Sequence, residues 1–214
     1  IAKHYDIPEF QPKIGDHRVV LEGGSIDTNG AGILLTTEDC LLSDIQQRNP
    51  TITREQLEQA FPDYLGIDQT LWLHKGAAGD DTHGHVDDIT RFVAENTILT
   101  AVEPNTRDEN HLPLAENLDR LRTARNLSGK PFEIVELPMP SPVVFEGQRL
   151  PASYANFYIA NNLVLVPTFN DPNDRRALNI IATCFPDRDV VGIHSVDLVW
   201  GLGTLHCMTQ QEPA

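Results

Sequence analysis

Four side chains in this sequence have the chemistry that hydrolysis of a guanidinium group requires. Cys207 supplies a thiol, His85 an imidazole, and Glu22 and Asp87 supply carboxylates. A thiolate can attack the electrophilic carbon of a guanidinium, and an imidazole can carry the protons that the reaction moves. Glycines stand beside or close to them, where a backbone or a substrate can approach closely. The set predicts an enzyme that acts on a guanidino compound.

The expected roles follow from the side-chain types. On a strand, His85 and Asp87 would point to the same face, so that Asp87 accepts a fork of N–H bonds from the guanidinium. His85 would act as general acid and base, and Glu22 would orient the imidazole and favour its charged form. Cys207 would attack, ammonia would leave, and water would hydrolyse the covalent thiouronium to a ureido product. Neither a metal nor an organic cofactor is expected.

Two other classes of protein fit parts of the pattern. His83, His85 and Asp87 lie in a run that resembles the His-x-His-x-Asp-His motif of metallo-β-lactamase-like hydrolases, although Asp88 replaces the last histidine. A metal-dependent hydrolase is therefore one alternative. The other is a module that binds a guanidinium without turning it over. Strong loss of activity to EDTA, reversed by zinc, would favour the metal site.

The composition restricts the partners. The chain of 214 residues has a net charge of −15, which disfavours nucleic acid and suits a small cationic substrate. No apolar run approaches the roughly 18 residues of a membrane helix, so no membrane partner is expected. Cys40, Cys184 and Cys207 are odd in number and widely spaced, which favours a reducing compartment and a cytoplasmic protein. A homo-oligomer remains open.

Turn signals divide the chain into a repeat. Apolar-rich segments at 19–27, 85–93 and 153–159 are the expected first strands of the repeat. They lead to turns that begin at Asn29, Glu95 and Asn161, at intervals of 66 residues, and another apolar strand follows each turn. A helical pattern and a further strand come next each time. The expected helices cover 53–61, 114–122 and 174–184, and the strands after them cover 70–74, 132–137 and 190–193. The unit is ββαβ, present three times, in an α/β protein.

Repeats of this length suggest a closed or stacked array. Glu22, then His85 with Asp87, then Asn156 are expected on the first strands of the three units, and Cys207 where a fourth unit would begin. A pseudosymmetric ring would gather them at one central site, whereas a plain α/β sandwich would not. Asn156 would hydrogen-bond either the substrate or the backbone.

Several segments together resemble the agmatine deiminase and bacterial-type peptidylarginine deiminase family, within the guanidino-modifying (pentein) superfamily. The resemblance spans nearly the whole chain. The matching segments are Leu-Glu22-Gly-Gly-Ser-Ile, Leu-Leu-Thr-Thr-Glu-Asp-Cys40-Leu-Leu, Arg48-Asn-Pro, Gly79-Asp-Asp-Thr-His-Gly-His-Val-Asp-Asp, Ala152-Ser-Tyr-Ala-Asn-Phe-Tyr-Ile-Ala-Asn, Phe185-Pro and His206-Cys-Met-Thr-Gln-Gln.

The resemblance implies a pentein-type pseudosymmetric α/β propeller of about five ββαβ modules, with residues 1–214 as part of one catalytic domain. It implies Cys207 as the nucleophile, His85 as the acid and base, and Glu22 as the partner of His85. Asp87 would be a guanidinium ligand and Asn156 a substrate contact. The expected reaction converts agmatine to N-carbamoylputrescine and ammonia, in putrescine and polyamine synthesis. Conversion of protein arginine to citrulline is the alternative within the family.

The sequence departs from the family pattern at its start. The family has an upstream Arg-Asp-x-Gly-Pro-like segment, whose aspartate is a second guanidinium ligand, and this sequence lacks one. The chain begins with Ile1 and shows three modules, so it is expected to lack the N-terminal modules of the propeller. Asp80, Asp81 and Asp88 are the candidates for a second ligand within this chain.

Overall fold

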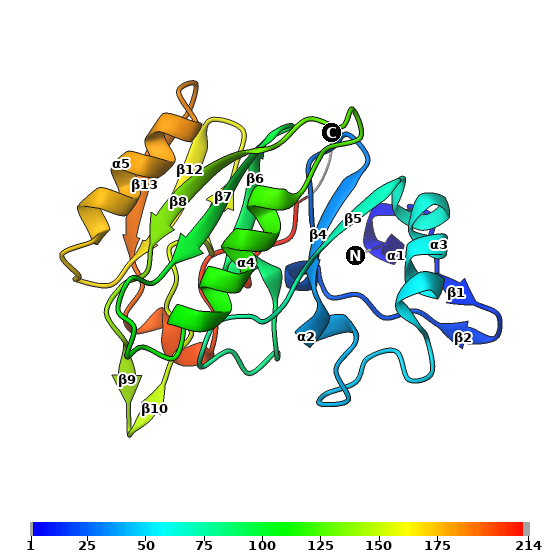
Figure 1. Ribbon diagram of the computed structural model, residues 1–214, viewed down its shortest axis with the longest axis horizontal. Coiled ribbons are helices and arrows are strands. Elements are labelled where there is room, and N and C mark those ends of the chain that lie inside the picture. The colour runs from blue at the N-terminus through cyan, green and yellow to red at the C-terminus, as the bar shows by residue number, and fades with distance from the viewer. Residues whose placement is uncertain (1, 212–214) are drawn as a thin grey trace.

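The computed structural model describes residues 2–211 and contains three successive ββαβ units (Figure 1). In each unit the first two strands are antiparallel, and the third strand pairs with the second in parallel. The predicted repeat is confirmed. The units comprise β3 (Asp27–Thr28), β4 (Ile33–Thr37), α3 (Arg54–Leu65) and β5 (Gln69–Leu73); β6 (Thr90–Ala94), β7 (Thr97–Val102), α4 (His111–Thr123) and β8 (Glu133–Pro138); and β11 (Tyr158–Ile159), β12 (Leu163–Thr168), α5 (Asp174–Cys184) and β13 (Asp189–His194).

Shorter elements lie outside these units. Two small hairpins and three single turns of 3-10 helix accompany two short helices. They are α1 (Ala2–Tyr5), β1 (Lys13–Ile14), β2 (His17–Arg18), η1 (Gly23–Ser25), α2 (Glu38–Leu41), η2 (Val86–Asp88), β9 (Val144–Phe145), β10 (Gln148–Arg149) and η3 (Leu198–Gly201). No helix within residues 2–211 is both long and apolar enough to span a membrane.

The first helix of the repeat begins where its sequence predicts and ends at Leu65, four residues beyond the predicted end. Thr53 Oγ1 accepts a bond from the Gln56 backbone N–H at 3.3 Å, and Gln56 Oε1 accepts one from the Thr53 N–H at 2.8 Å. This reciprocal capping box satisfies two backbone donors that α3 would otherwise leave free. Gly66, at φ +66°, ends the helix in the left-handed conformation that glycine adopts without strain.

The first strand of each unit is shorter than expected. The predicted strands 19–27, 85–93 and 153–159 contribute only β3, β6 and β11, because irregular segments take up their first residues. In the first unit, Gly23–Ser25 form η1, and Ser25 Oγ donates to the Glu22 carbonyl at 2.7 Å. A chain that turns on itself in this way cannot continue a ladder. These irregular segments carry the candidate site residues.

Each helix packs against strands of its own unit and, for α4 and α5, of the preceding unit as well. Helix α4 contacts β7 and β5, and α5 contacts β13 and β8. Buried apolar side chains of neighbouring units accordingly share cores. One core joins Ile33, Leu71, Ile98 and Leu114, and another joins Leu99, Leu137, Val164 and Ile181.

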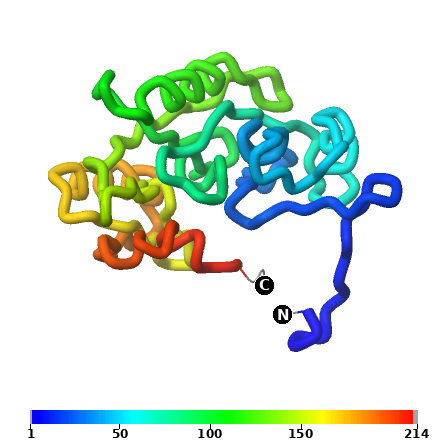
Figure 2. Tube along the Cα trace, turned by 90° about the horizontal axis from the view of Figure 1, so that it is seen from below, coloured from blue at the N-terminus to red at the C-terminus, as the bar shows by residue number. Residues whose placement is uncertain are grey.

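The three units lie side by side along an arc (Figure 2). The C-terminal segment that follows η3 runs back toward the middle of that arc. As a result, residues near position 207 come beside the segments that precede β3 and β6, which are far away in the sequence. The arrangement positions four separate stretches of chain around one region.

Candidate active site

The candidate residues lie on the irregular segments that precede the first strands, and not on the strands themselves. Glu22 precedes η1, His85 precedes η2, Asn156 lies two residues before β11, and Cys207 lies in a turn after η3. The prediction that they occupy strands is therefore wrong. Their positions are nevertheless equivalent. Glu22, His85 and Asn156 each lie on the segment that leads into a ββαβ unit, and Cys207 lies on the segment that follows the third unit.

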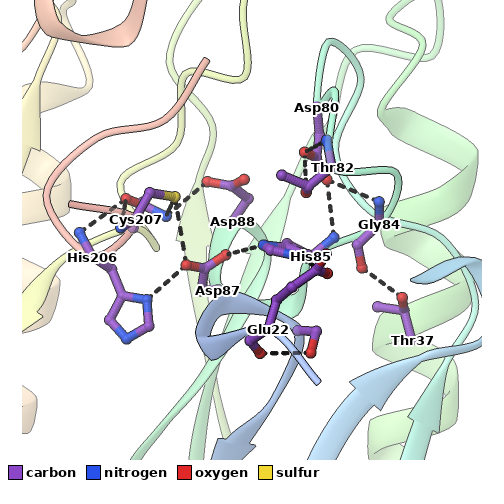
Figure 3. Close-up of polar contacts among 12 residues, drawn as sticks. Glu22, Thr37, Asp80, Thr82, Gly84, His85, Asp87, Asp88, His206 and Cys207 are labelled. Carbon is purple, nitrogen blue, oxygen red and sulfur yellow. Dashed lines mark hydrogen bonds and ion pairs between the residues drawn. The ribbon is translucent and has the colours of Figure 1, made fainter. Parts of the chain in front are cut away.

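His85 and Asp87 face the same region for a different reason from the one predicted. His85 has extended backbone angles and Asp87 belongs to the 3-10 turn η2, so the two-residue period of a strand does not apply. The imidazole Nδ1 still lies 4.0 Å from Asp87 Oδ1. Its Nε2 lies 2.9 Å from Glu22 Oε2 (Figure 3). The imidazole thus stands between two carboxylates.

Cys207 completes the cluster. Its Sγ lies 3.6 Å from Asp87 Oδ2 and 3.0 Å from Asn156 Nδ2. The cavity beside it has a volume of about 1110 Å³ and is lined by Glu22, Gly24, His85, Asp87, His206 and Cys207, among others. A thiol, an imidazole and a carboxylate therefore meet at one wall of a cavity, and together they can bind a cation and move protons at a carbon held between them.

Asp87 has an oxygen with no protein partner. The side chain is fully buried, its Oδ2 lies 2.6 Å from His206 Nδ1, and its Oδ1 has no hydrogen-bond partner among the described residues. A buried carboxylate oxygen without a donor is costly unless a ligand supplies one. A guanidinium has N–H groups that suit this need, because it can give parallel bonds to a carboxylate.

The carboxylate of Asp88 behaves differently from that of Asp87. Burial, followed by the charge of Asp87, raises the pKa of Asp88 well above its usual value. Asp88 Oδ1 accepts a bond from Asn156 Nδ2 at 3.0 Å. Two adjacent buried carboxylates do not both ionise readily. Asp87 differs in its contacts, since its Oδ2 lies 2.6 Å from His206 Nδ1 and its Oδ1 has no hydrogen bond among the described residues.

Partial burial, together with the nearby carboxylates of Asp88 and Asp87, raises the pKa of the Cys207 thiol. The residue as a whole is exposed, whereas its sulfur faces Asn156 and Asp87. Without a cation at the site, Cys207 is therefore a neutral thiol. A cation bound to Asp87 would offset the negative charge and favour the thiolate.

Glu22 stays ionised. Burial alone would raise its pKa, but the hydrogen bonds from His85 and from Arg48, with their charges, outweigh burial and lower the pKa below the usual value. The ionised Glu22, with its Oε2 2.9 Å from His85 Nε2, holds the imidazole in one orientation.

Asn156 holds the segment that carries Cys207. It is fully buried, and its Oδ1 accepts bonds from Thr204 Oγ1 at 2.8 Å and from the backbone N–H groups of His206 and Cys207 at 3.0 and 3.3 Å. Its side chain does not appear among the residues that line the cavity. The sequence predicted that Asn156 would hydrogen-bond either the substrate or the backbone. In the structure its Oδ1 accepts hydrogen bonds from the backbone.

Replacing Asn156 with alanine should therefore weaken the structure and the reaction together. The variant leaves three donors and the Asp88 acceptor without their partner, which we expect to lower the free energy of unfolding by about 2 kcal/mol. The rate at saturating substrate should fall more than the apparent affinity. Urea unfolding and steady-state kinetics measure both. Asn105→Ala, at an exposed turn, is the control, and an equal loss of stability there would contradict this role for Asn156.

Three further residues near the site make contacts that local sequence patterns did not predict. Residues 205–208 form a turn, and the His206 ring reaches Asp87. Arg48 contacts Glu22 with its Nε 3.0 Å from Oε2. Asp80 accepts bonds from the backbone N–H groups of Gly84 and His85, both at 2.9 Å. The spacing of residues in the sequence does not predict these contacts. Arg48 and Asp80 do lie in segments that resemble the family.

The candidates for a second guanidinium ligand differ in their availability. The Asp80 oxygens are already used as acceptors within their own loop, by Thr82, Gly84 and His85. Asp88 is buried against Asn156 and does not line the cavity. Asp81 does line the cavity, as does Asp27, which sequence reasoning did not single out. Asp27 is buried, and burial raises its pKa.

The histidine run does not converge on one point. The His83 ring lies 3.4 Å from an Asp39 oxygen, away from His85. Among the described residues, two sets of three groups are close enough to share a metal ion: Glu22 with Cys40 and His85, and Asp87 with Asp88 and Cys207. His83 belongs to neither set, so the triad of His83, His85 and Asp87 that was expected under the metal alternative is not assembled.

Glycine is required where the chain passes His85 and Asp87. A Cβ on Gly24 would lie 2.5 Å from His85 Nδ1 and 2.7 Å from Asp87 Oδ2, whereas a Cβ on Gly23 would meet only Gln210 Oε1, at 3.6 Å. Gly24→Ala should therefore displace the reacting groups and lower kcat/KM by about 100-fold, with little change in melting temperature. Steady-state kinetics and thermal unfolding test this. Gly23→Ala is the matched control, and equal activity of the two variants would contradict the prediction.

Comparisons with known proteins place the chain among deiminases. A model of the Porphyromonas-type peptidyl-arginine deiminase family matches residues 1–213. Agmatine deiminase of Pseudomonas putida is 37% identical to this chain, over 91% of this chain and 57% of its own length. Agmatine deiminase of Enterococcus faecalis has a similar structure, with a TM-score of 0.85, 36% identity, and coverage of 91% of this chain and 57% of that one.

A further solved structure is that of a Cys-to-Ser variant of C. jejuni agmatine deiminase with substrate bound. It matches with a TM-score of 0.81 and 35% identity, over 88% of this chain and 55% of that one. These likenesses confirm the expected fold, since the same α/β modules occur in the same order at this level of identity. The chain spans less than two thirds of the length of these relatives.

Proposed function

This chain belongs to the Porphyromonas-type peptidyl-arginine deiminase family, and from that premise we propose that it carries the catalytic groups of a guanidine deiminase. The reaction is the hydrolysis of agmatine to N-carbamoylputrescine and ammonia, a step toward putrescine. The observation that carries the proposal is the unpartnered Oδ1 of buried Asp87, on a carboxylate whose other oxygen lies 3.6 Å from Cys207 Sγ. A guanidinium bound there has its carbon beside a sulfur nucleophile.

The proposed mechanism runs in two halves. Asp87 binds the guanidinium, whose charge favours loss of the Cys207 proton to His85. The thiolate attacks the carbon, a C–S bond forms, and His85 returns the proton to the departing nitrogen as the C–N bond breaks and ammonia leaves. His85 then takes a proton from water, whose oxygen attacks the thiouronium. The C–S bond breaks, the sulfur regains a proton, and the ureido product is released. Glu22 holds the imidazole throughout.

The charge of the cavity favours agmatine over a peptide substrate. Agmatine has a second cation at its far end, and Asp81 adds a carboxylate to the cavity wall beyond Asp87 and Glu22. Asp27 also lines the cavity, but it is paired with Arg91, whose Nε lies 3.4 Å from its Oδ2. Negative groups along a cavity attract a dication and steer it inward. The relatives from P. putida, E. faecalis and C. jejuni carry the name of agmatine deiminase.

Peptidyl arginine is the second candidate. The cavity volume of about 1110 Å³ exceeds what a small diamine derivative fills, and the family model carries the name of a peptidyl-arginine deiminase. A peptide could place an arginine side chain at Asp87 and its backbone in the remaining volume.

We also keep a cytoplasmic location in the proposal, since Cys40, Cys184 and Cys207 are all free thiols.

An assay for ureido products tests the proposal. The protein that carries this sequence, in the longest form in which it is expressed, would be given agmatine, arginine or an arginine peptide, each with and without EDTA. We expect product from agmatine, unaffected by EDTA. If product formed from the peptide alone, peptidyl arginine would be the substrate in place of agmatine. Loss of activity in EDTA that zinc restores would favour a metal hydrolase. Binding of agmatine without any product would indicate a binding module.

A further inference from the structure

Arg48 lies behind the acid–base pair and outside the cavity. Its side chain is 9% exposed, and its Nε donates to Glu22 at 3.1 Å from Oε1 and 3.0 Å from Oε2. The Nη2 group donates to the carbonyl of Thr82, three residues before His85, and Nη1 donates to the Gln46 carbonyl at 3.2 Å. One guanidinium thus joins Glu22 to the loop that leads into His85.

From this geometry we propose that Arg48 is a positioning residue for the acid–base pair: it holds Glu22 against His85 and keeps the carboxylate ionised. The proposal rests on the deiminase function proposed above. Arg48 is absent from the residues that line the cavity, so it acts through Glu22 and not on the substrate. The role is separate from that of any group expected to contact the guanidinium.

The need for such a residue follows from the exposure of Glu22. Its side chain is 41% exposed, and a long, half-exposed carboxylate side chain samples several rotamers unless bonds restrict it. Arg48 restricts it with an N–H directed between the two oxygens, while Oε2 remains 2.9 Å from His85 Nε2. A planar guanidinium held at three points provides a fixed anchor, which a lysine ammonium does not reproduce.

The loop that carries Arg48 is itself attached to the segment before Glu22. Asn49, 3% exposed, accepts a bond from the Val20 N–H at 2.7 Å and donates to the Val20 carbonyl at 2.9 Å. Consecutive residues therefore bind the backbone at Val20 and the carboxylate of Glu22. This attachment fixes Arg48 relative to the chain that it supports.

The charges around Glu22 determine the expected pH effect. Arg48 and His85 face its carboxylate from two sides, and Cys40 is the third titratable group close to it. Burial raises the pKa of Cys40 to about 12, so this thiol stays neutral. Asp39 lies beside Cys40 on α2, and Asp80 lies in the loop that precedes His85. Removing Arg48 takes away one of the two groups that lower the pKa of Glu22 and leaves its burial in place. The pKa of Glu22 should therefore rise, and the carboxylate should protonate at higher pH.

Two substitutions separate position from charge. Arg48→Met removes both, so kcat/KM should fall by about 100-fold on its plateau, and the acidic limb of its pH profile should move to higher pH. Arg48→Lys keeps the charge and loses the anchor at Thr82, so the plateau should fall while the acidic limb stays near that of the parent. Arg120→Met is the control, since Arg120 binds two carboxylates, of Glu38 and Glu116, outside the cavity.

A measurement independent of turnover keeps the inference separate from the proposed function. Carbon-13 NMR of the glutamate carboxyl groups, with Glu22 assigned through Glu22→Gln, follows its titration directly. A higher titration midpoint of Glu22 in Arg48→Met than in the parent supports the inference. If the parent produces no ureido compound, only the proposed function is contradicted, and the midpoint still tests the inference. An unchanged midpoint, or full activity of both Arg48 variants, would overturn the inference. If Arg48→Met fails to fold, Arg48→Lys decides through its plateau.

Discussion

Cys207→Ala is expected to reduce ureido production by roughly 10⁴-fold or more, because Cys207 is the one cysteine of residues 2–211 that lines the cavity. The folded state should be nearly unaffected. Cys207 is an exposed residue, and its sulfur receives one hydrogen bond, from Asn156. Its surroundings favour the thiol over the thiolate, so loss of the sulfur removes no stabilising ion pair. The product assay and thermal unfolding of the same samples measure the two effects.

A second cysteine provides the matched control for this variant. Cys184 is a half-buried free thiol at the end of α5, and it packs with apolar side chains of the third unit. Cys184→Ala should keep nearly all activity. Normal turnover by Cys207→Ala would disprove the covalent mechanism, and equal loss in both variants would point to damage of the fold instead of loss of a nucleophile.

The repeat could be predicted from the sequence because its signals are local. A two-residue turn at Glu95, a capping box at Thr53 and the apolar spacing along 174–184 each depend on neighbours within a few residues. The structure has these elements at or within a few residues of the predicted bounds, and α5 has the predicted bounds. Hydrophobic periodicity decides such elements independently of what they later pack against.

The prediction was wrong where the chain leaves regular structure to build the site. The stretches around Glu22, His85 and Asn156 are rich in apolar or aromatic residues, and this suggested strands. In the structure, hydrogen bonds from side chains to the backbone replace the ladder, such as those that Asp80 receives from Gly84 and His85. Polar side chains that bond nearby backbone compete with secondary structure, and a pattern of hydrophobicity does not register that competition.

Contacts between segments that are far apart in the sequence could not be predicted from local patterns either. Arg48 reaches Glu22 across 26 residues, and His206 reaches Asp87 across 119. Both depend on how the units lie along the arc and on the return of the C-terminal segment (Figure 2). The roles of Cys207, His85 and Glu22 were available from residue chemistry and from the family resemblance, and their convergence in space is consistent with those roles, which stay predictions until activity is measured.

The electrostatic character of the site refines what the net charge suggested. The charge of −15 predicted attraction of a small cation, but did not locate it. The carboxylates of Glu22, Asp27 and Asp87 face one cavity, while Arg48 partly offsets the charge of Glu22 from behind. Asp87 lies next to the thiol, and its Oδ1 has no hydrogen bond among the described residues, so we expect the cation to bind there. The Asp87 carboxylate would therefore attract the cation and, until the cation binds, raise the pKa of the Cys207 thiol.

The opposing effects of Asp87 give the second large prediction. Asp87→Asn should weaken binding of the guanidinium by about 3 kcal/mol, roughly a hundredfold in KM, because a buried cation loses its charged partner. The same change removes one of the charges that raise the pKa of Cys207, so the pKa of the thiol should fall. Alkylation of Cys207 by iodoacetamide at fixed pH, without substrate, should then become faster. Turnover and thiol reactivity should therefore change in opposite directions.

Asp88→Asn is the matched control, one residue away. Burial, followed by the charge of Asp87, raises the pKa of Asp88, so the negative form of this carboxyl group is disfavoured, and asparagine preserves its shape. The Oδ1 acceptor for Asn156 is kept as well. We expect kcat/KM within about threefold of the parent, because asparagine keeps the shape of this buried side chain and its acceptor for Asn156. If Asp88→Asn lost binding as Asp87→Asn does, Asp87 would not be the one carboxylate that binds the cation. Unchanged alkylation in Asp87→Asn would show that the charge of Asp87 does not hold the Cys207 thiol neutral.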